Sequence, residues 1–200
     1  MTGIAIYMEG GGNTAHTKAS LRTGMDRFLA ELKDLAREKS WPWKLVCCGG
    51  RDQAFRRFIN SRRNDDDTIV LLLVDAEGPV TSEPRNHLTQ RDKWDLAGIP
   101  DEDIHLMIQT MEAWIVADAD TLRAFYGQGF IANALPRAAN LDAIAKTDIA
   151  NALDHATRQA RPKGIYHKIK HASDLLKLID PEIVRSKCPA CMRLFRILRE

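Results

Sequence analysis

Four carboxylates lie at or just beyond the ends of candidate β-strands: Glu9, Asp75, Glu77 and Glu112. In a parallel α/β sheet, ligands bind outside the carboxyl ends of the strands, so we expect these acids to face one edge. Carboxylates that are brought together repel one another unless a cation or a basic group joins them. Magnesium and manganese prefer oxygen ligands of this kind. The pattern therefore predicts a site for Mg²⁺ or Mn²⁺ at this edge.

Three of these acids also have a second interpretation. Asp75 and Glu77 are two residues apart just past an apolar run, so both can extend toward the same side of the pleat. The alternative is that they cap a turn before Pro79. Glu112 follows a candidate strand, but it also fits the first turn of a helix, where an acid is favoured by the helix dipole. Both alternatives stay open at the level of the sequence.

Three consecutive glycines, Gly10–Gly12, follow Glu9. Such a segment lets the backbone approach a phosphate closely or turn sharply toward the next helix. The sequence contains neither a GxxxxGK[ST] P-loop nor, in this segment, a GxGxxG fingerprint. A tight turn explains the glycines as well as a phosphate cradle does, and Glu9 beside them favours the cradle.

The net charge of +2 conceals an uneven distribution. Residues 101–155 carry three basic and nine acidic residues, whereas residues 156–200 carry eleven basic and four acidic residues. A basic end is the pattern expected where a phosphate backbone binds, although a solvated helix face explains it too. The candidate contacts to nucleic acid are Arg51, Lys163, Lys168, Lys170 and His171. Lys168 is also a catalytic candidate that can stabilise negative charge in a transition state.

Strand and helix signals alternate over the first 120 residues, which predicts an α/β fold with a mostly parallel sheet flanked by helices. The candidate strands are Gly3–Met8, Trp43–Cys48, Thr68–Asp75 and Ile104–Gln109. Apolar spacing predicts one helix over Ala19–Lys39, and residues 77–103 are expected to form a long irregular loop with a short helical turn. After Gly127 the pattern is mostly helical. We expect an α/β domain over residues 1–126 and a basic helical extension over residues 127–200 packed on it.

Composition excludes several classes of protein. A hydrophobic fraction of 44% with a small net charge indicates a folded chain, and the longest apolar run, Ile69–Val74, is too short to span a membrane. The segment MTGIAIYMEGGG lacks the basic start of a secretion signal, so we expect a cytoplasmic protein with reduced cysteines. Cys188 and Cys191 have the spacing of zinc ligands, but Cys47 and Cys48 do not complete the site. Burial as small apolar residues is the default for all four.

Four segments carry a resemblance to known proteins: EGGGNT at 9–14, VDAEGPV at 74–80, QTMEAWIVAD at 109–118 and YHKIKHASDLL at 166–176. A strand that ends in Glu-Gly, followed by a later strand that ends in an acidic pair, is similar to the metal-binding plan of Toprim domains. Over nearly its whole length the chain resembles the bacterial domain-of-unknown-function family "four-two-seven-six". Members look Toprim-like, and related proteins occur beside ATPases in phage-defence loci.

The resemblance implies a Toprim-like, Rossmann-like fold and a catalytic site. Glu9 would be a metal ligand or general acid/base, and Asp75 and Glu77 would hold Mg²⁺. One departure is that the second acidic pair is usually Asp-x-Asp, whereas this chain has Asp75-Ala76-Glu77. Glutamate keeps the charge but reaches one methylene further, so the metal position can differ.

Three functions compete on this evidence. The first is a Toprim-like, Mg²⁺-dependent nuclease that hydrolyses RNA or DNA as part of an anti-phage defence system with a partner ATPase. The second is a non-catalytic effector or adaptor subunit that docks a partner ATPase through its charged regions. The third is a phosphotransfer or nucleotide-hydrolysing enzyme that uses the same metal cluster. The sequence does not determine whether the polymer is DNA or RNA, where it is cut, what activates the protein or which oligomeric state it adopts.

Overall fold

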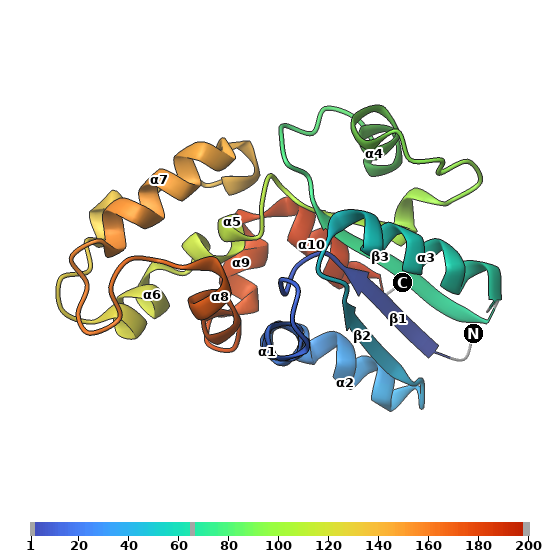
Figure 1. Ribbon diagram of the computed structural model, residues 1–200, viewed down its shortest axis with the longest axis horizontal. Helices are drawn as coiled ribbons and strands as arrows, with labels where there is room; N and C mark the ends of the chain where they lie inside the picture. The colour runs from blue at the N-terminus through green and yellow to red at the C-terminus, as the bar shows by residue number, and fades with distance from the viewer. Residues whose placement is uncertain (1–2, 65–66, 198–200) are drawn as a thin grey trace.

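The computed structural model describes residues 3–64 and 67–197, and in this part of the chain four strands form one sheet (Figure 1). They are β1 (Gly3–Met8), β2 (Trp43–Cys47), β3 (Thr68–Asp75) and β4 (Ile104–Met107). All neighbouring pairs are parallel, and the order is β2-β1-β3-β4. The predicted α/β fold with a parallel sheet flanked by helices is confirmed.

The strand order places a topological switch point between β1 and β3. The chain leaves β1 toward β2 on one side and leaves β3 toward β4 on the other side. Connections that depart in opposite directions open a crevice at the carboxyl ends of the two central strands, and ligands of open α/β sheets bind in such crevices. The residues that follow β1 and β3 are therefore the first place to look for a site.

The part of the chain that the structure describes also contains ten α-helices: α1 (Ala15–Phe28), α2 (Ala30–Glu38), α3 (Arg51–Asn64), α4 (Pro84–Asp92), α5 (Glu112–Ala117), α6 (Ala119–Tyr126), α7 (Lys146–Thr157), α8 (Lys168–Leu176), α9 (Pro181–Lys187) and α10 (Pro189–Arg196). Three single 3₁₀ turns lie at Asp101–Asp103, Ala132–Ala134 and Leu141–Ala143. The sheet, with α3 on one face and α1 and α2 on the other, occupies one half of the molecule, and α6, α7 and α8 occupy the other (Figure 1).

Alternation along the strands explains why both faces of the sheet are covered. Ile4, Ile6 and Met8 of β1 belong to the larger apolar core, whereas Ala5 and Tyr7 belong to the smaller one. Successive side chains of a strand point to opposite faces, so a continuous apolar run requires apolar neighbours on both. The helices that follow each strand provide those neighbours.

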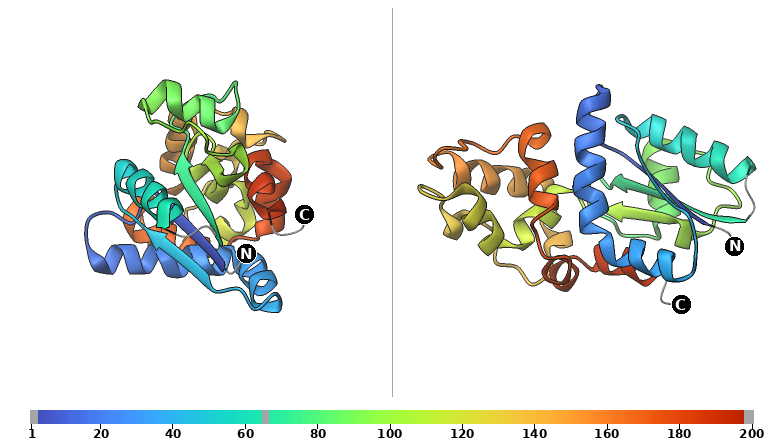
Figure 2. Two further views of the ribbon diagram at one scale, coloured as in Figure 1. Left: turned by 90° about the vertical axis from the view of Figure 1, so that its right-hand side faces the viewer. Right: turned by 90° about the horizontal axis from the view of Figure 1, so that it is seen from below.

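Two expectations about local structure are wrong. The helix predicted over Ala19–Lys39 is two helices, because the backbone leaves the helical conformation at the fully buried Leu29 and turns so that α2 runs in a new direction (Figure 2, right). The segment 77–103 contains α4, a helix of nine residues rather than a single turn. Pro84 begins this helix and Lys93 ends it in the left-handed conformation, two signals of helix boundaries.

In the second half of the molecule, α8 packs directly on α1. Gly24 of α1 faces Ser173 of α8, and a Cβ built on this glycine would lie 2.4 Å from the Ser173 carbonyl oxygen. Only glycine permits so close an approach of the two helices. One apolar core runs from Met25 in α1 to Leu175 in α8, and Figure 2 (right) shows α1 between the sheet and the helical half. The domain boundary after residue 126 stays a prediction.

Two further expectations concern membrane segments and cysteines. Over residues 3–64 and 67–197, no helix combines the length and the apolar character needed to cross a membrane. All four cysteines are buried free thiols, as expected for small apolar residues.

Candidate metal centre

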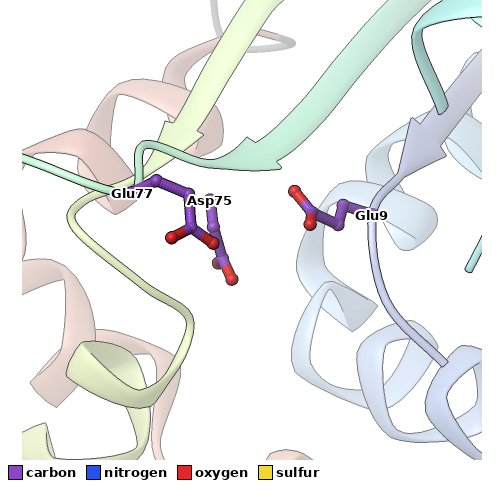
Figure 3. A group of neighbouring side chains, drawn as sticks. All are labelled: Glu9, Asp75 and Glu77. Atoms are coloured by element: carbon purple, nitrogen blue, oxygen red, sulfur yellow. The ribbon is translucent and has the colours of Figure 1, made fainter. Parts of the chain in front are cut away.

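Three of the predicted acids meet at the switch point of the sheet, and we call Glu9, Asp75 and Glu77 the acidic cluster. Each offers one carboxylate oxygen, and these oxygens all lie within 4.8 Å of one another. Figure 3 shows the side chain from the end of β1 and the two from the end of β3 facing the same space. The expectation that acids from distant segments converge at the carboxyl edge is confirmed for these three.

Glu9 is fixed by backbone bonds to both neighbouring strands. Its N–H donates to the Leu73 carbonyl at 3.0 Å, and Gly10 and Gly49 exchange two N–H···O bonds of 2.9 Å. Gly10, Gly11 and Gly12 all have positive φ, and a Cβ at Gly11 would lie 2.9 Å from the Lys18 Cα. The glycines are therefore required by a sharp turn that leads directly into α1.

Asp75 is the most deeply buried acid of the cluster, with 4% of its surface exposed. Its Oδ1 accepts the Met111 N–H at 2.8 Å, and its Oδ2 accepts from Lys168 Nζ at 3.4 Å. The pKa of Asp75 is raised to about 7, chiefly by burial and also by the negative charges of Glu112 and Glu9, while Lys168 and the Met111 N–H oppose the rise. A buried acid among acids destabilises the fold unless a cation joins it, which is characteristic of functional sites.

Glu77 reaches the cluster by a route that the sequence analysis did not predict. The strand ends at Asp75, and Glu77 adopts a left-handed conformation with φ of 64°. Its N–H donates to the Gln109 carbonyl at 2.7 Å, and its carboxylate pairs with Lys146. Partial burial acts to raise the pKa of Glu77, but the Lys146 ammonium outweighs it and lowers this pKa. A strained turn, not the pleat, therefore places the two acids together.

Arg51 fixes one side of the acidic cluster. Its Nε and Nη2 donate to both oxygens of Asp92 at 2.8 Å, and its Nη1 donates to Glu9 at 3.1 Å and to the Asp75 carbonyl. The guanidinium also lies over the Trp94 ring, 5.2 Å from its centroid. Four of its five N–H groups are engaged, so Arg51 is a rigid part of the site.

Glu112 lies outside the acidic cluster and is joined to it through Lys168. Lys168 Nζ lies 3.4 Å from Asp75 Oδ2 and 3.3 Å from Glu112 Oε2, and its side chain is 51% exposed. Glu112 also accepts from the Thr110 hydroxyl and from the Tyr166 hydroxyl at 3.1 Å. Burial acts to lower the pKa of Lys168, but the two carboxylates raise it, so the ammonium is charged at neutral pH.

Lys168 lines two cavities, and Glu9 and Asp75 of the acidic cluster line the first of them. The glycine-loop cavity, about 260 Å³, lies between Gly10–Gly12, Glu9, Asp75 and the start of α8. The α7 cavity, about 500 Å³, lies between α5, α7 and Tyr166, and its wall includes Lys146 and Thr110. Both volumes are close to or within the range of small-molecule sites, roughly 300–1,000 Å³.

The other predicted phosphate contacts do not line either cavity. Lys163 holds its ammonium 4.2 Å from the centre of the Phe125 ring, and Lys170 is exposed. His171 Nδ1 accepts from the Tyr126 hydroxyl at 3.0 Å and from the His167 N–H at 3.2 Å. These residues lie outside the acidic cluster, and their role in binding stays a prediction.

Sequence analysis missed Lys146 and Asp92, the partners of Glu77 and Arg51. A weak signal existed for Lys146, because it is one of only three basic residues in the acidic region 101–155. No local signal exists for Asp92, since its partner is 41 residues away in the sequence.

The fold and the cluster define an α/β protein with an acidic, oxygen-only candidate metal centre at the switch point of its sheet. Residues 8–199 match the model of the family described as "Domain of unknown function (DUF4276)", and the chain belongs to this family. No curated protein and no solved structure matches the chain.

Proposed function

We propose that the protein is a Toprim-like, metal-dependent nuclease that hydrolyses phosphodiester bonds in RNA or DNA. The observation that supports this function most strongly is the convergence of Glu9, Asp75 and Glu77 at the switch point. The donor set fits Mg²⁺ or Mn²⁺, because all three ligands are carboxylate oxygens. A divalent cation held there supplies Lewis-acid polarisation of a phosphodiester.

In this proposal, Glu112 and the basic residues beside the acidic cluster have distinct roles. Arg51 holds Glu9 and the backbone of Asp75 in place. Lys168 is only loosely bonded and half exposed, so its ammonium can move onto a phosphate and offset the negative charge that develops in the transition state. Glu112 keeps Lys168 beside the cluster. The Toprim resemblance extends the proposal to phage defence with a partner ATPase.

Two measurements on the purified chain test the proposal. Isothermal titration with Mg²⁺ and Mn²⁺ measures metal binding, and single-stranded and duplex RNA and DNA with either metal measure cleavage. The double variant Glu9→Gln/Asp75→Asn is expected to lose both, because two of three ligand charges are removed. The matched control is Asp34→Asn/Glu38→Gln, which neutralises two exposed acids of α2 and is expected to behave as wild type.

The outcomes separate the competing functions. Cleavage that survives the Glu9/Asp75 double variant contradicts the assignment of this site. Metal binding without cleavage of any polymer, but with hydrolysis of mononucleotides, favours the third function. An adaptor predicts no carboxylate-dependent metal binding at all, so a flat titration overturns the proposal.

A further inference from the structure

We infer that the α7 cavity is the substrate pocket for one unpaired nucleotide of a single-stranded nucleic acid, and that Lys146 and Lys168 bind its phosphate. This inference rests on the proposed nuclease function and names the substrate of that site. The evidence is the position of two lysines that line the cavity and pair with acids of the cluster, together with the chemistry of the cavity wall.

Both lysines lie between the cavity and the acidic cluster. Each lines the α7 cavity, and each pairs with an acid of the cluster, Lys146 with Glu77 and Lys168 with Asp75. Their side chains are 44% and 51% exposed, so neither is locked in place by packing. A group bound in this cavity therefore meets two ammonium groups that also contact the acidic cluster.

The two lysines now balance carboxylate charge that a divalent cation would balance instead. When a cation occupies the same oxygens, the attraction that holds Lys146 on Glu77 and Lys168 on Asp75 weakens, and both ammonium groups become available for a phosphate. Binding of metal and binding of substrate are then coupled, and each strengthens the other.

The rest of the cavity wall fits a nucleoside. Ala150 and Leu153 of α7 give it an apolar side, and Tyr166 adds an aromatic side chain. Hydrogen-bonding groups come from the hydroxyls of Thr110 and Thr147 and the carboxylates of Glu112 and Asp154. These carboxylates restrict the phosphate to the lysine side of the cavity. In Figure 1, α7 lies on one side of α5 and α8 on the other. Tyr166 belongs to the segment between α7 and α8. An unpaired base that is no longer stacked on its neighbours can pack against an apolar and aromatic wall. Bases in a duplex are paired and stacked, so we expect the cavity to select single strands.

The test measures binding separately from cleavage. A short fluorescently labelled single-stranded oligonucleotide, as DNA and as RNA, is titrated with the full chain in Ca²⁺, a hard cation with oxygen ligands that replaces Mg²⁺, and in EDTA. We expect Ca²⁺ to tighten binding about tenfold and the single strand to bind at least tenfold tighter than the duplex.

Two variants locate the ligand. Ala150→Trp fills the cavity and is expected to weaken oligonucleotide binding at least tenfold, whereas Asn151→Trp, at the next and exposed position of α7, is expected to bind as wild type. Lys146→Met/Lys168→Met is expected to lower the slope of log affinity against log salt by roughly 1.4 and to remove most of the Ca²⁺ effect. Lys177→Met serves as the control for loss of a surface lysine. Circular dichroism tests whether each variant is folded. If Ala150→Trp does not fold, the Lys146→Met/Lys168→Met variant alone tests the pocket assignment.

The outcomes distinguish this inference from the proposed function. If Ala150→Trp and the lysine double variant both bind the oligonucleotide as tightly as wild type, the pocket assignment is wrong, even when the wild type cleaves nucleic acid. If both lose binding while the wild type cleaves nothing in Mg²⁺, the pocket assignment holds and the nuclease proposal fails. Preference for duplex over single strand overturns the inference directly.

Discussion

Arg51 and Lys168 both contact the acidic cluster, and they are held in very different ways. Arg51 engages four of its five N–H groups and is mostly buried, with 14% of its side chain exposed. Lys168 makes two long contacts, of 3.3 and 3.4 Å, and half of its side chain is exposed. The difference indicates that one cation builds the site whereas the other is free to act in it.

The largest expected effect is on stability when Arg51 is lost. Arg51→Met leaves Glu9 without its partner and Asp92 with Arg91 alone, so we expect the free energy of unfolding to fall by about 3 kcal/mol. Urea denaturation measures this change. Arg56→Met, at an exposed position of the same helix, is the matched control and is expected to stay within about 0.5 kcal/mol of wild type.

The second prediction is that loss of Lys168, unlike loss of Arg51, affects activity much more than stability. Lys168→Met is expected to slow cleavage about 10²–10³-fold while it changes the free energy of unfolding by less than about 1 kcal/mol. The reason is that its side chain is half exposed and its ammonium makes only long contacts of 3.3 and 3.4 Å in the ground state, whereas its charge becomes important when negative charge develops on a phosphate. Comparable losses of stability in Lys168→Met and Arg51→Met would remove the distinction between the two cations.

The sequence predicted the parts of this site that depend on strand ends, and it missed those that depend on long-range pairing. Glu9 and Asp75 follow apolar strands, and a parallel sheet necessarily brings such positions to one edge. The position of Glu77 beside Asp75 was predicted from the pleat of the strand, which is the wrong reason. A left-handed turn places Glu77 there, and a glutamate does not indicate such a turn in the sequence. The pairs Arg51–Asp92 and Lys146–Glu77 join residues 41 and 69 positions apart, and charge alone cannot choose such partners among 56 charged residues.

The third prediction uses pH to examine the acid between the two cations. Because the pKa of Asp75 is raised to about 7, the folded protein keeps this proton at pH values where the unfolded chain has lost it. Its contribution to stability is therefore present below about pH 4 and is lost as the pH rises to 7. Without metal, Asp75→Asn is expected to be more stable than wild type at pH 8, by on the order of 2 kcal/mol, and no more stable at pH 4.

Thermal unfolding in EDTA across this pH range measures the third prediction, with Asp34→Asn as the control for an exposed acid. The same pH dependence in wild type and Asp75→Asn would show that Asp75 carries no such penalty. Added Mg²⁺ is expected to remove the difference at pH 8, because a ligand that binds only the folded state stabilises it. The Asp75→Asn variant is also expected to be inactive. A buried acid that destabilises the fold is expected to be retained because the activity requires it.

The smallest expected effect concerns Glu112. The prediction distinguishes two roles for this residue, that of a metal ligand and that of a residue that positions Lys168. Its two oxygens already accept from Thr110, Tyr166 and Lys168, and it lies outside the acidic cluster. We expect Glu112→Gln to slow cleavage only about tenfold, since glutamine keeps an acceptor for Lys168 but loses the charge that attracts it. Calorimetry is expected to show a change of less than about threefold in Mg²⁺ affinity, a difference below roughly 0.7 kcal/mol. A loss of affinity as large as that of Glu9→Gln would make Glu112 a fourth ligand. In that case Lys168 would lose both of its carboxylate partners when metal binds, and its freedom to reach a phosphate would increase.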